Sequence, residues 1–161
     1  MKKKSGIIKV VCSVILGIIA GGALSNYFKN KTIDKESKTV AKFKNYYNLL
    51  NQWLSLKNEG KSLEKYFVDN GYSTIAIYGM GEMGNRLYEE LKKSSITVKY
   101  AIDKNAGSAF SELEVYNLEE DLEEVDVVVV TAVFAFEEIY DELSGQVDFP
   151  IISLEDVIYE L

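Results

Sequence analysis

The sequence predicts an α/β fold in which five parallel strands form a doubly wound sheet over residues 72–161. Strand-like and helix-like stretches alternate along this part of the chain. The strand-like stretches are apolar throughout, rather than apolar at every second position. A strand that is apolar on both faces is buried on both faces, which is typical of a parallel sheet covered by helices. A glycine-rich turn after the first of these strands supports the same fold class.

The order of the elements follows from the apolar runs and the turns between them. Strands are predicted at residues 74–78, 97–102, 114–116, 126–131 and 150–153. Helices are predicted at residues 82–93, 137–143 and 154–159, with a turn-rich stretch at 103–111 and a short acidic helix or turn at 118–124. Right-handed crossovers between parallel strands then give an open sheet with helices on both faces.

Residues 1–31 are predicted to form a transmembrane helix that anchors the chain. Residues 10–28 run for 19 residues without a charge, close to the roughly 20 that a helix needs to cross a bilayer. A cleavable signal peptide, with a small-residue cleavage site at 21–23, is the alternative. Four small residues recur at every fourth position, a spacing through which two such helices can associate; they are Ser13, Gly17, Gly21 and Ser25.

Residues 32–71 are predicted to be a helical connector with two apolar stripes. The first has heptad-like spacing and comprises Val40, Phe43, Tyr47, Leu50 and Leu54. The second lies beside it and comprises Tyr46, Leu49, Trp53 and Leu56. Such a wide apolar face must be covered. Two interpretations are open: the helix packs on its own globular domain, or residues 40–56 and the anchor pair with a second copy or with another membrane protein.

Composition excludes several classes of function. The chain has 161 residues, 18 Lys and Arg against 25 Asp and Glu, and a sequence pI of about 4.8. Such an acidic chain lacks the basic face that phosphate contacts need, so no nucleic-acid partner is expected. The absence of histidine and the single Cys12 exclude histidine-based catalysis and zinc clusters. The acid-rich run at 112–126 is interpreted as a solvated edge, and no metal site is predicted.

The strongest chemical signal is the motif G-x-G-x-x-G at residues 79–84, because it follows the first strand and opens the first helix. Gly79 would make the tight turn, Gly81 would let a phosphate approach the backbone, and Gly84 would let helix and strand pack closely. Free N–H groups at the helix start and the helix dipole favour a pyrophosphate there. The candidate contacts therefore also include the three residues between the glycines, Met80, Glu82 and Met83.

Two polar residues are expected at the same edge of the sheet. Asp103 ends the second strand, 24 residues past Gly79, where a carboxylate can accept hydrogen bonds from ribose hydroxyls. Its charge favours NAD over NADP, and the adjacent Lys104 offsets that preference. Thr131 is a candidate polar contact after the fourth strand. Phe134 and Phe136, which follow it, either stack on a ligand ring or cover the core.

These segments together resemble the NAD(P)-binding Rossmann superfamily: GMGEMG after a strand, a strand ending AIDKN, EVYNLEED, DVVVVTAVF and PIISLEDVI. More narrowly, they resemble the small Rossmann-like modules of bacterial surface-polysaccharide biosynthesis clusters, such as the N-terminal domains of some sugar acyltransferases. The resemblance covers about residues 62–161 and carries over to Gly79, Gly81, Gly84 and Asp103. It implies NAD or a nucleotide-sugar as ligand. No acyltransferase activity is expected, because the chain ends at Leu161 without the domain that performs it.

Catalysis by the chain alone is not expected. Epimerases and short-chain dehydrogenases use a Tyr-x-x-x-Lys pair on a helix after the fourth strand. This spacing occurs only elsewhere, at Tyr27/Lys31, Tyr88/Lys92 and Tyr100/Lys104. The chain is therefore predicted to be a nucleotide-binding accessory or regulatory subunit in surface-polysaccharide assembly. The alternatives are a structural protein-interaction module with a degenerate site, and an NAD oxidoreductase or epimerase component that depends on a partner.

The chain is expected in the cell membrane as a single-pass protein with a cytoplasmic globular domain. Six lysines follow the predicted span at residues 29–44 and four precede it, a small excess that favours a cytoplasmic C-terminal side. The expectation rests mainly on the predicted nucleotide site, since nucleotides are abundant in the cytosol.

Overall fold

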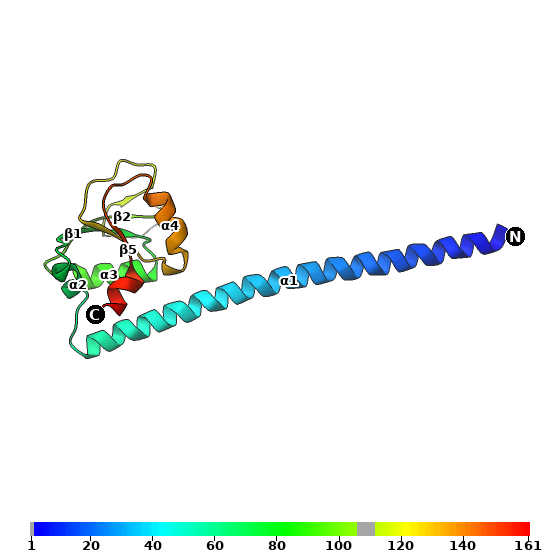
Figure 1. Ribbon diagram of the computed structural model, residues 1–161, viewed down its shortest axis with the longest axis horizontal. Coiled ribbons are helices and arrows are strands. Elements are labelled where there is room, and N and C mark those ends of the chain that lie inside the picture. The colour runs from blue at the N-terminus through cyan, green and yellow to red at the C-terminus, as the bar shows by residue number, and fades with distance from the viewer. Residues whose placement is uncertain (1, 106–111) are drawn as a thin grey trace. The chain divides into compact units, whose positions relative to one another are not determined.

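The computed structural model describes the backbone of residues 2–105 and 112–161, and the side chains of residues 29, 31–105 and 112–161. The chain forms two compact units, Met1–Lys44 and Asn45–Leu161. Helix α1 (Lys2–Asn58) supplies the first unit and the first residues of the second (Figure 1).

The first unit contains the predicted anchor. Among the residues that the structure describes, none belongs to a helix long and apolar enough to span a bilayer. The side chains of residues 1–28 and 30 lie outside the described set. The predicted span at 10–28 and its small-residue stripe both fall on those residues, so the anchor stays a prediction.

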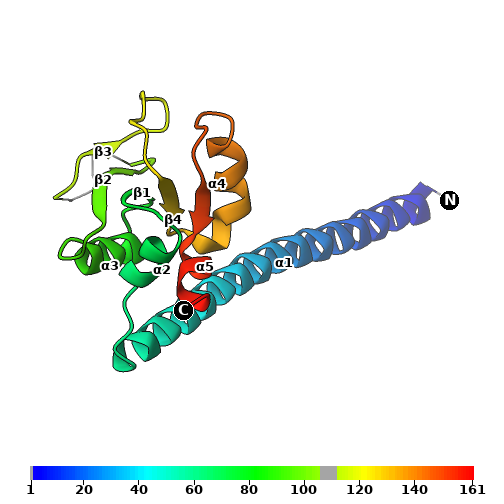
Figure 2. The same cartoon turned by 60° about the vertical axis from the view of Figure 1, so that its left-hand side comes forward.

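The second unit is built on a five-stranded, all-parallel sheet in the order β3-β2-β1-β4-β5 (Figure 2). The strands are β1 (Thr74–Tyr78), β2 (Thr97–Ile102), β3 (Val115–Tyr116), β4 (Val127–Val130) and β5 (Ile151–Ser153). All four valine side chains of β4 are fully buried, as expected for a central strand covered on both faces. The predicted α/β fold and its five parallel strands are confirmed.

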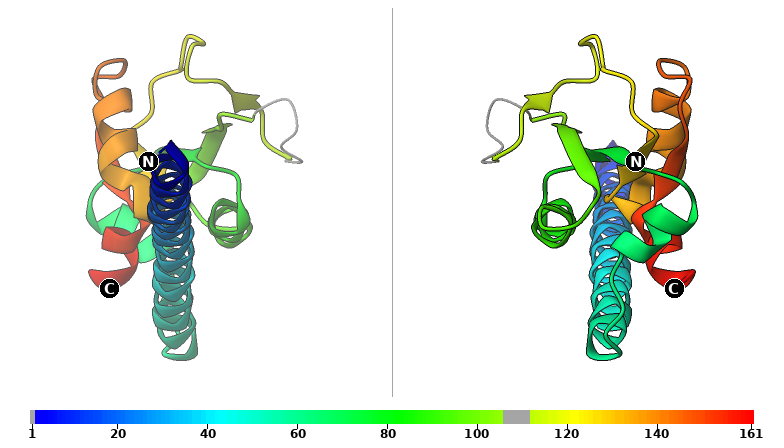
Figure 3. Two further views of the ribbon diagram at one scale, coloured as in Figure 1. Left: turned by 90° about the vertical axis from the view of Figure 1, so that its right-hand side faces the viewer. Right: turned by 90° about the vertical axis from the view of Figure 1, so that its left-hand side faces the viewer.

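Helices cover both faces of the sheet. One face is covered by α2 (Glu64–Asp69), α3 (Glu82–Leu91), α5 (Leu154–Tyr159) and the last turns of α1. The other face is covered by α4 (Phe136–Leu143), which follows the short 3-10 helix η2 (Val133–Ala135). The side chains of β1 alternate between the two cores, because Ile75 and Ile77 join the first and Ala76 joins the second. Figure 3 shows α3 in green and α4 in orange on either side of the strands.

The connection from β3 to β4 contains no helix. The stretch at 118–124 begins with a turn and continues as a loop. Leu118 and Val125 from this loop are buried against the α4 face, so a loop completes that core where a helix would otherwise lie. Residues 106–111 of the predicted turn-rich stretch lie outside the described residues.

The two stripes of α1 have different environments. From the second stripe, Leu49, Trp53 and Leu56 are buried in the core shared with α3. Tyr47 and Leu54 from the first stripe are exposed by 66% and 56%. The second stripe therefore packs on the chain's own domain, and the first does not.

A buried carboxylate joins α1 to α3. The Oε2 atom of Glu90 accepts hydrogen bonds from Trp53 Nε1 at 2.7 Å and Lys57 Nζ at 2.8 Å. Its Oε1 atom accepts one from the backbone N–H of Leu63 at 3.0 Å. Burial raises the pKa of Glu90. The hydrogen bonds from Lys57, Leu63 and Trp53 together lower it by a larger amount, so the pKa lies below its ordinary value.

Candidate functional site

The sequence-predicted site residues come together at the carboxyl edge of the sheet. Gly79 follows β1, Asp103 follows β2 and Thr131 follows β4. The strand β1 lies between β2 and β4, and the chain builds the sheet outward in opposite directions from these central strands. Ligands of open parallel sheets bind outside the carboxyl ends of the strands at such a reversal of strand order.

The turn from β1 into α3 depends on Gly79. This residue has a φ of +93°, a region that side-chain-bearing residues rarely adopt. A Cβ atom there would lie 3.0 Å from Thr131 Oγ1. The Gly79 N–H donates to the carbonyl of Ile102 at 2.8 Å, which ties the turn to the end of β2. The predicted tight turn at Gly79 is thus confirmed.

Gly84 sits where α3 touches the turn. A Cβ atom at this position would lie 2.1 Å from the carbonyl oxygen of Gly79 and 3.4 Å from Ile77 Cγ2. No side chain fits at such distances without moving the helix. The predicted role of Gly84 in close packing between helix and strand is therefore confirmed.

Asp103 holds the glycine turn. Its Oδ2 atom accepts a hydrogen bond from the backbone N–H of Met80 at 2.8 Å. Its Oδ1 atom accepts one from the backbone N–H of Asn105 at 2.8 Å. The sequence placed Asp103 at this edge for ribose binding, whereas the structure uses both carboxylate oxygens to position the backbone on either side. Any ribose contact would have to share these oxygens, each of which can accept a second hydrogen bond.

Thr131 joins β4 to the same turn. Its hydroxyl lies 2.7 Å from the carbonyl oxygen of Gly79 and 3.1 Å from that of Tyr78, and its single proton can serve one of them at a time. The residue is 3% exposed. Thr131 therefore fixes the turn from the β4 side, as Asp103 does from the β2 side.

The N-terminus of α3 is the part of the turn left open. Gly81 is the N-cap, with φ −76° and ψ −163°, and no side chain caps the helix among the described residues. A Cβ atom at Gly81 would meet no described atom within 4 Å. The first N–H groups of a helix have no partner inside it and carry the positive end of its dipole. This geometry suits an anionic oxygen approaching the backbone.

The remaining motif residues divide between core and surface. The side chains of Met80 and Met83 are 8% and 4% exposed and belong to the core under α3, so only their backbone could face a ligand. Glu82 is exposed in the first turn of α3. Its carboxylate favours the helix dipole, and it places a negative charge beside any bound phosphate.

Sequence reasoning missed a polar group directly before the glycine turn. Tyr78 is 4% exposed, and its buried hydroxyl has no hydrogen-bond partner among the described residues. Burial raises the pKa of this phenol, nearby Lys104 lowers it, and the carboxylates of Glu142, Asp103 and Glu138 raise it, so the pKa lies above its ordinary value. The Lys104 Nζ atom pairs with Glu142 on α4 at 2.8 Å. The sequence signal for this polar group is a tyrosine at the end of a mostly aliphatic strand.

The aromatic residues after β4 contact protein. Phe134 meets Tyr46 of α1 edge to face, with ring centroids 5.8 Å apart. Phe136 packs beside the α4 core and tilts against Tyr140. Residues 133–138, Ser153 and Glu155–Asp156 line a hollow of about 690 Å³ at this edge. Phe136 thus covers the core on the α4 face, whereas Phe134 contacts Tyr46 and keeps 47% of its surface exposed.

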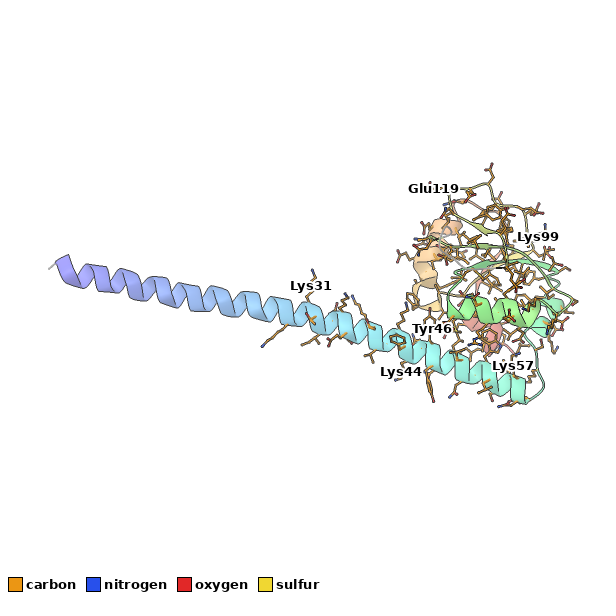
Figure 4. All side chains as sticks on the ribbon, turned by 180° about the vertical axis from the view of Figure 1, so that it is seen from behind. Lys31, Lys44, Tyr46, Lys57, Lys99 and Glu119 are labelled. Atoms are coloured by element: carbon orange, nitrogen blue, oxygen red, sulfur yellow. The ribbon has the colours of Figure 1, made fainter. Side chains whose placement is uncertain are left out.

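Another hollow lies at the opposite edge of the sheet. It measures about 770 Å³ and is lined by residues 118–122, 124–126 and 146–150, which precede β4 and β5. Glu119, labelled in Figure 4, is one of the lining residues. This is the amino edge of the sheet, away from the glycine turn, and its acidic lining does not suit a phosphate. Size alone therefore does not mark the candidate site.

The Tyr-x-x-x-Lys spacings do not form a catalytic pair at this site. The Tyr100 hydroxyl donates to the carbonyl of Glu123 at 2.6 Å, and burial raises the pKa of this phenol to about 12. In the Tyr88/Lys92 spacing, the Lys92 Nζ atom lies 5.8 Å from the centroid of the Tyr88 ring, near the C-terminal end of α3. The described tyrosines of these spacings are therefore held by structural contacts.

Comparison of the chain with protein families, with curated proteins and with solved structures finds no match.

Proposed function

We propose that this chain is a membrane-anchored module that binds a nucleotide, NAD or a nucleotide-sugar, at the glycine turn. It would act as a non-catalytic accessory or regulatory subunit in bacterial surface-polysaccharide assembly. The observation that carries the proposal is the open space at Gly81. There the ten-residue helix α3 begins directly after β1 without a side-chain cap among the described residues, and a Cβ atom would meet no described atom within 4 Å.

Each part of the turn has a role in this proposal. The diphosphate accepts hydrogen bonds from the first N–H groups of α3, and the missing Cβ of Gly81 lets it approach. Asp103 and Thr131 act as positioning residues, because they hold the backbone of Met80 and Gly79 in place. A preorganised loop binds more tightly, since less conformational entropy is lost on binding.

The proposed cellular placement follows from the ligand. The N-terminal helix would remain uncleaved in the cell membrane, and the second unit would lie in the cytoplasm, where nucleotides are abundant. The lysines at 29–44 are consistent with this orientation under the positive-inside rule.

A second candidate function is a protein-interaction module that has kept the fold without the ligand. Two observations favour it. Both oxygens of Asp103 already accept backbone hydrogen bonds, and Glu82 places a negative charge beside the open helix end. Both features lower the affinity expected for a ribose and a phosphate.

A melting experiment with the full chain separates the two functions. The melting temperatures of the native protein and of the Gly81→Val variant are measured with and without NAD, NADP, UDP-sugars and coenzyme A. A nucleotide at 100 times its dissociation constant should stabilise the native protein by about 2.7 kcal/mol. Gly81→Val should abolish that gain and leave the ligand-free melting temperature almost unchanged, because the added side chain enters open space.

Gly145→Val is the matched control. Gly145 follows α4, and a Cβ there meets only the carbonyl of Glu142, at 4.0 Å. This variant should retain the full response to ligand. If no nucleotide shifts melting at millimolar concentration, the interaction module is the correct function. Asp103 is a poorer test position, because its substitution alters the turn and the ligand contact together.

A further inference from the structure

An apolar stripe on α1 is left exposed after the domain has packed. We call it the exposed stripe; it consists of Val40, Phe43, Tyr47, Leu50 and Leu54. Its members are between 43% and 67% exposed. Figure 4 shows side chains along this helix and labels Lys44 and Tyr46, on either side of the boundary between the two units. Contiguous exposed apolar surface of this kind marks an interaction site.

The exposed stripe has room for a partner. At 3.6 residues per turn, Tyr47, Leu50 and Leu54 lie about 120° around α1 from Leu49 and Trp53. Leu49 and Trp53 are buried against the domain. Within the second unit, the domain therefore packs on a different side of α1 from the side that carries Tyr47, Leu50 and Leu54.

The spacing of the exposed stripe specifies the shape of the partner. Its members are separated by 3, 4, 3 and 4 residues, the a and d positions of a coiled coil. The same register is occupied by Glu36 before the stripe and by Lys57 after it. These charges end the apolar seam on both sides. The fitting partner is an α-helix with an apolar seam of the same spacing and length.

A second copy of this chain supplies that seam, and it fits best in parallel. In a parallel, in-register pair each apolar residue faces its own equivalent. In an antiparallel pair, one register places Leu54 opposite Glu36 and the other places Val40 opposite Lys57. Only the parallel arrangement buries every member of the stripe against an apolar side chain.

The residues that flank the seam contain no repulsive pair. In a parallel coiled coil, each g position faces the e position five residues later on the other helix. By position those pairs are Thr39 with Lys44, Tyr46 with Asn51, and Trp53 with Asn58. Trp53 is buried in its own domain and makes no contact with a partner there. None of these pairs joins two like charges, so the pairing of identical chains meets no electrostatic penalty there. Beside the seam, Leu50, Trp53 and Leu54 with α3 residues line a groove of about 380 Å³ that flanking side chains can fill.

The area available indicates a weak pair. Aromatic side chains bury about 150–250 Å² each, and Phe43 and Tyr47 are about two-thirds exposed. The whole stripe therefore offers on the order of 500 Å² per copy, less than the roughly 800 Å² of a stable interface. Such a contact forms when the local concentration is high, as it is for chains held at a membrane.

We propose that two copies of this chain associate through the exposed stripe as a parallel, in-register two-helix coiled coil. This inference is independent of nucleotide binding, because none of the stripe residues lies at the glycine turn.

Cysteine cross-linking of the full chain in intact cells tests the proposal. Cys12→Ser removes the native thiol, and single cysteines are placed at Val40, Tyr47 or Leu54. Asn48→Cys is the matched control, because Asn48 is exposed on the same helix and lies about 100° around it from Tyr47. Each stripe cysteine should cross-link to its own equivalent at least tenfold faster than the control. Equal rates, or no cross-linking at the stripe, would overturn the proposal.

A second measurement tests the register and the surface. Co-expression of Val40→Cys with Leu50→Cys, or of Phe43→Cys with Leu54→Cys, should give little mixed dimer. The two antiparallel registers place these residues opposite each other, so an abundant mixed dimer of either kind would show an antiparallel pair. In the Leu54→Cys background, Tyr47→Glu with Leu50→Glu should reduce cross-linking at least tenfold, while Asn45→Glu with Asn48→Glu should leave it unchanged. Unchanged cross-linking in the stripe variant would place the contact elsewhere and refute the interface.

Discussion

The two ends of α3 differ in how their polar groups are satisfied. Near its C-terminal end, Glu90 is buried and accepts hydrogen bonds from Trp53, Lys57 and the backbone of Leu63. At its N-terminal end, Gly81 caps the helix without a side chain and faces open space. The C-terminal end is closed by contacts between segments that are distant in the sequence. The N-terminal end is held in place by the neighbouring strands, and its first turn is left open.

This contrast distinguishes the contacts that stabilise the fold from the backbone groups that are available to a ligand. A buried negative charge is tolerated only when hydrogen-bond donors surround it. The role of Glu90 is therefore to stabilise the folded second unit. A helix N-terminus needs partners too, and water or a ligand supplies them where the protein does not. The open end is therefore the part of α3 that the fold can leave to a ligand.

The largest expected effect comes from Gly84, at the boundary between the closed and open parts of the turn. Gly84→Ala places a Cβ atom 2.1 Å from the carbonyl oxygen of Gly79, so α3 must move away from β1. We expect the free energy of unfolding to fall by about 3 kcal/mol or more. Urea denaturation followed by the fluorescence of the single tryptophan, Trp53, measures it, because Trp53 is buried against α3.

Gly81→Ala is the control within the same motif. Its Cβ atom meets no described neighbour. Because Ala is a poorer N-cap than Gly, the free energy of unfolding should fall, but by no more than about 1 kcal/mol. Equal destabilisation by the two variants would show that Gly81 also has a packing role, and would weaken the case for an open site.

The next largest effect is expected at the closed end. Glu90→Gln removes the charge that four donors share, from Trp53, Lys57, Ser62 and the backbone of Leu63. It also brings an amide N–H₂ group toward Trp53 and Lys57. The free energy of unfolding should fall by about 2 kcal/mol. Glu89→Gln is the matched control, because Glu89 is exposed on the same helix and should cost less than about 0.5 kcal/mol. An equal effect at both positions would mean that the Glu90 contacts add nothing specific.

The effect of Glu90 should depend on pH. The pKa of Glu90 in the folded chain lies below its ordinary value of 4.5. Its contribution is therefore complete above about pH 4.5 and is lost as the pH falls toward the folded-state pKa. The difference in stability between the native protein and Glu90→Gln should shrink below pH 4.5. A difference that grows in acid would contradict the assigned direction.

The sequence predicts the sheet well because its signals are local. Four consecutive valines identify β4 without knowledge of their neighbours, and glycines spaced as in 79–84 identify a turn from strand to helix. The two stripes on α1 were also visible. Which of them packs on the domain was not, because that depends on where α3 and α5 lie in space.

Other features depend on partners far away in the sequence. Glu90 is one acid among many until Trp53 and Leu63, 37 and 27 residues earlier, are brought to it. Asp103 was placed at the correct edge from its position after a strand. Its hydrogen bond to the Met80 backbone could not be inferred, because it requires the geometry of the turn around Gly79.

The smallest effect, and the only stabilising one, is expected beside the open end. Tyr78 ends β1 with a buried hydroxyl that has no partner in the described part of the chain, whereas the Tyr100 hydroxyl donates to the carbonyl of Glu123 at 2.6 Å. Replacing an unsatisfied buried hydroxyl by hydrogen removes a desolvation cost, so Tyr78→Phe should raise the free energy of unfolding by about 1 kcal/mol. Tyr100→Phe, the matched change at a satisfied phenol, should lower it by a similar amount. Both are measured by urea denaturation without ligand. If Tyr78→Phe is also destabilising, the Tyr78 hydroxyl already has a hydrogen-bond partner. The polar groups at this end of the sheet are then as fully hydrogen-bonded as those around Glu90.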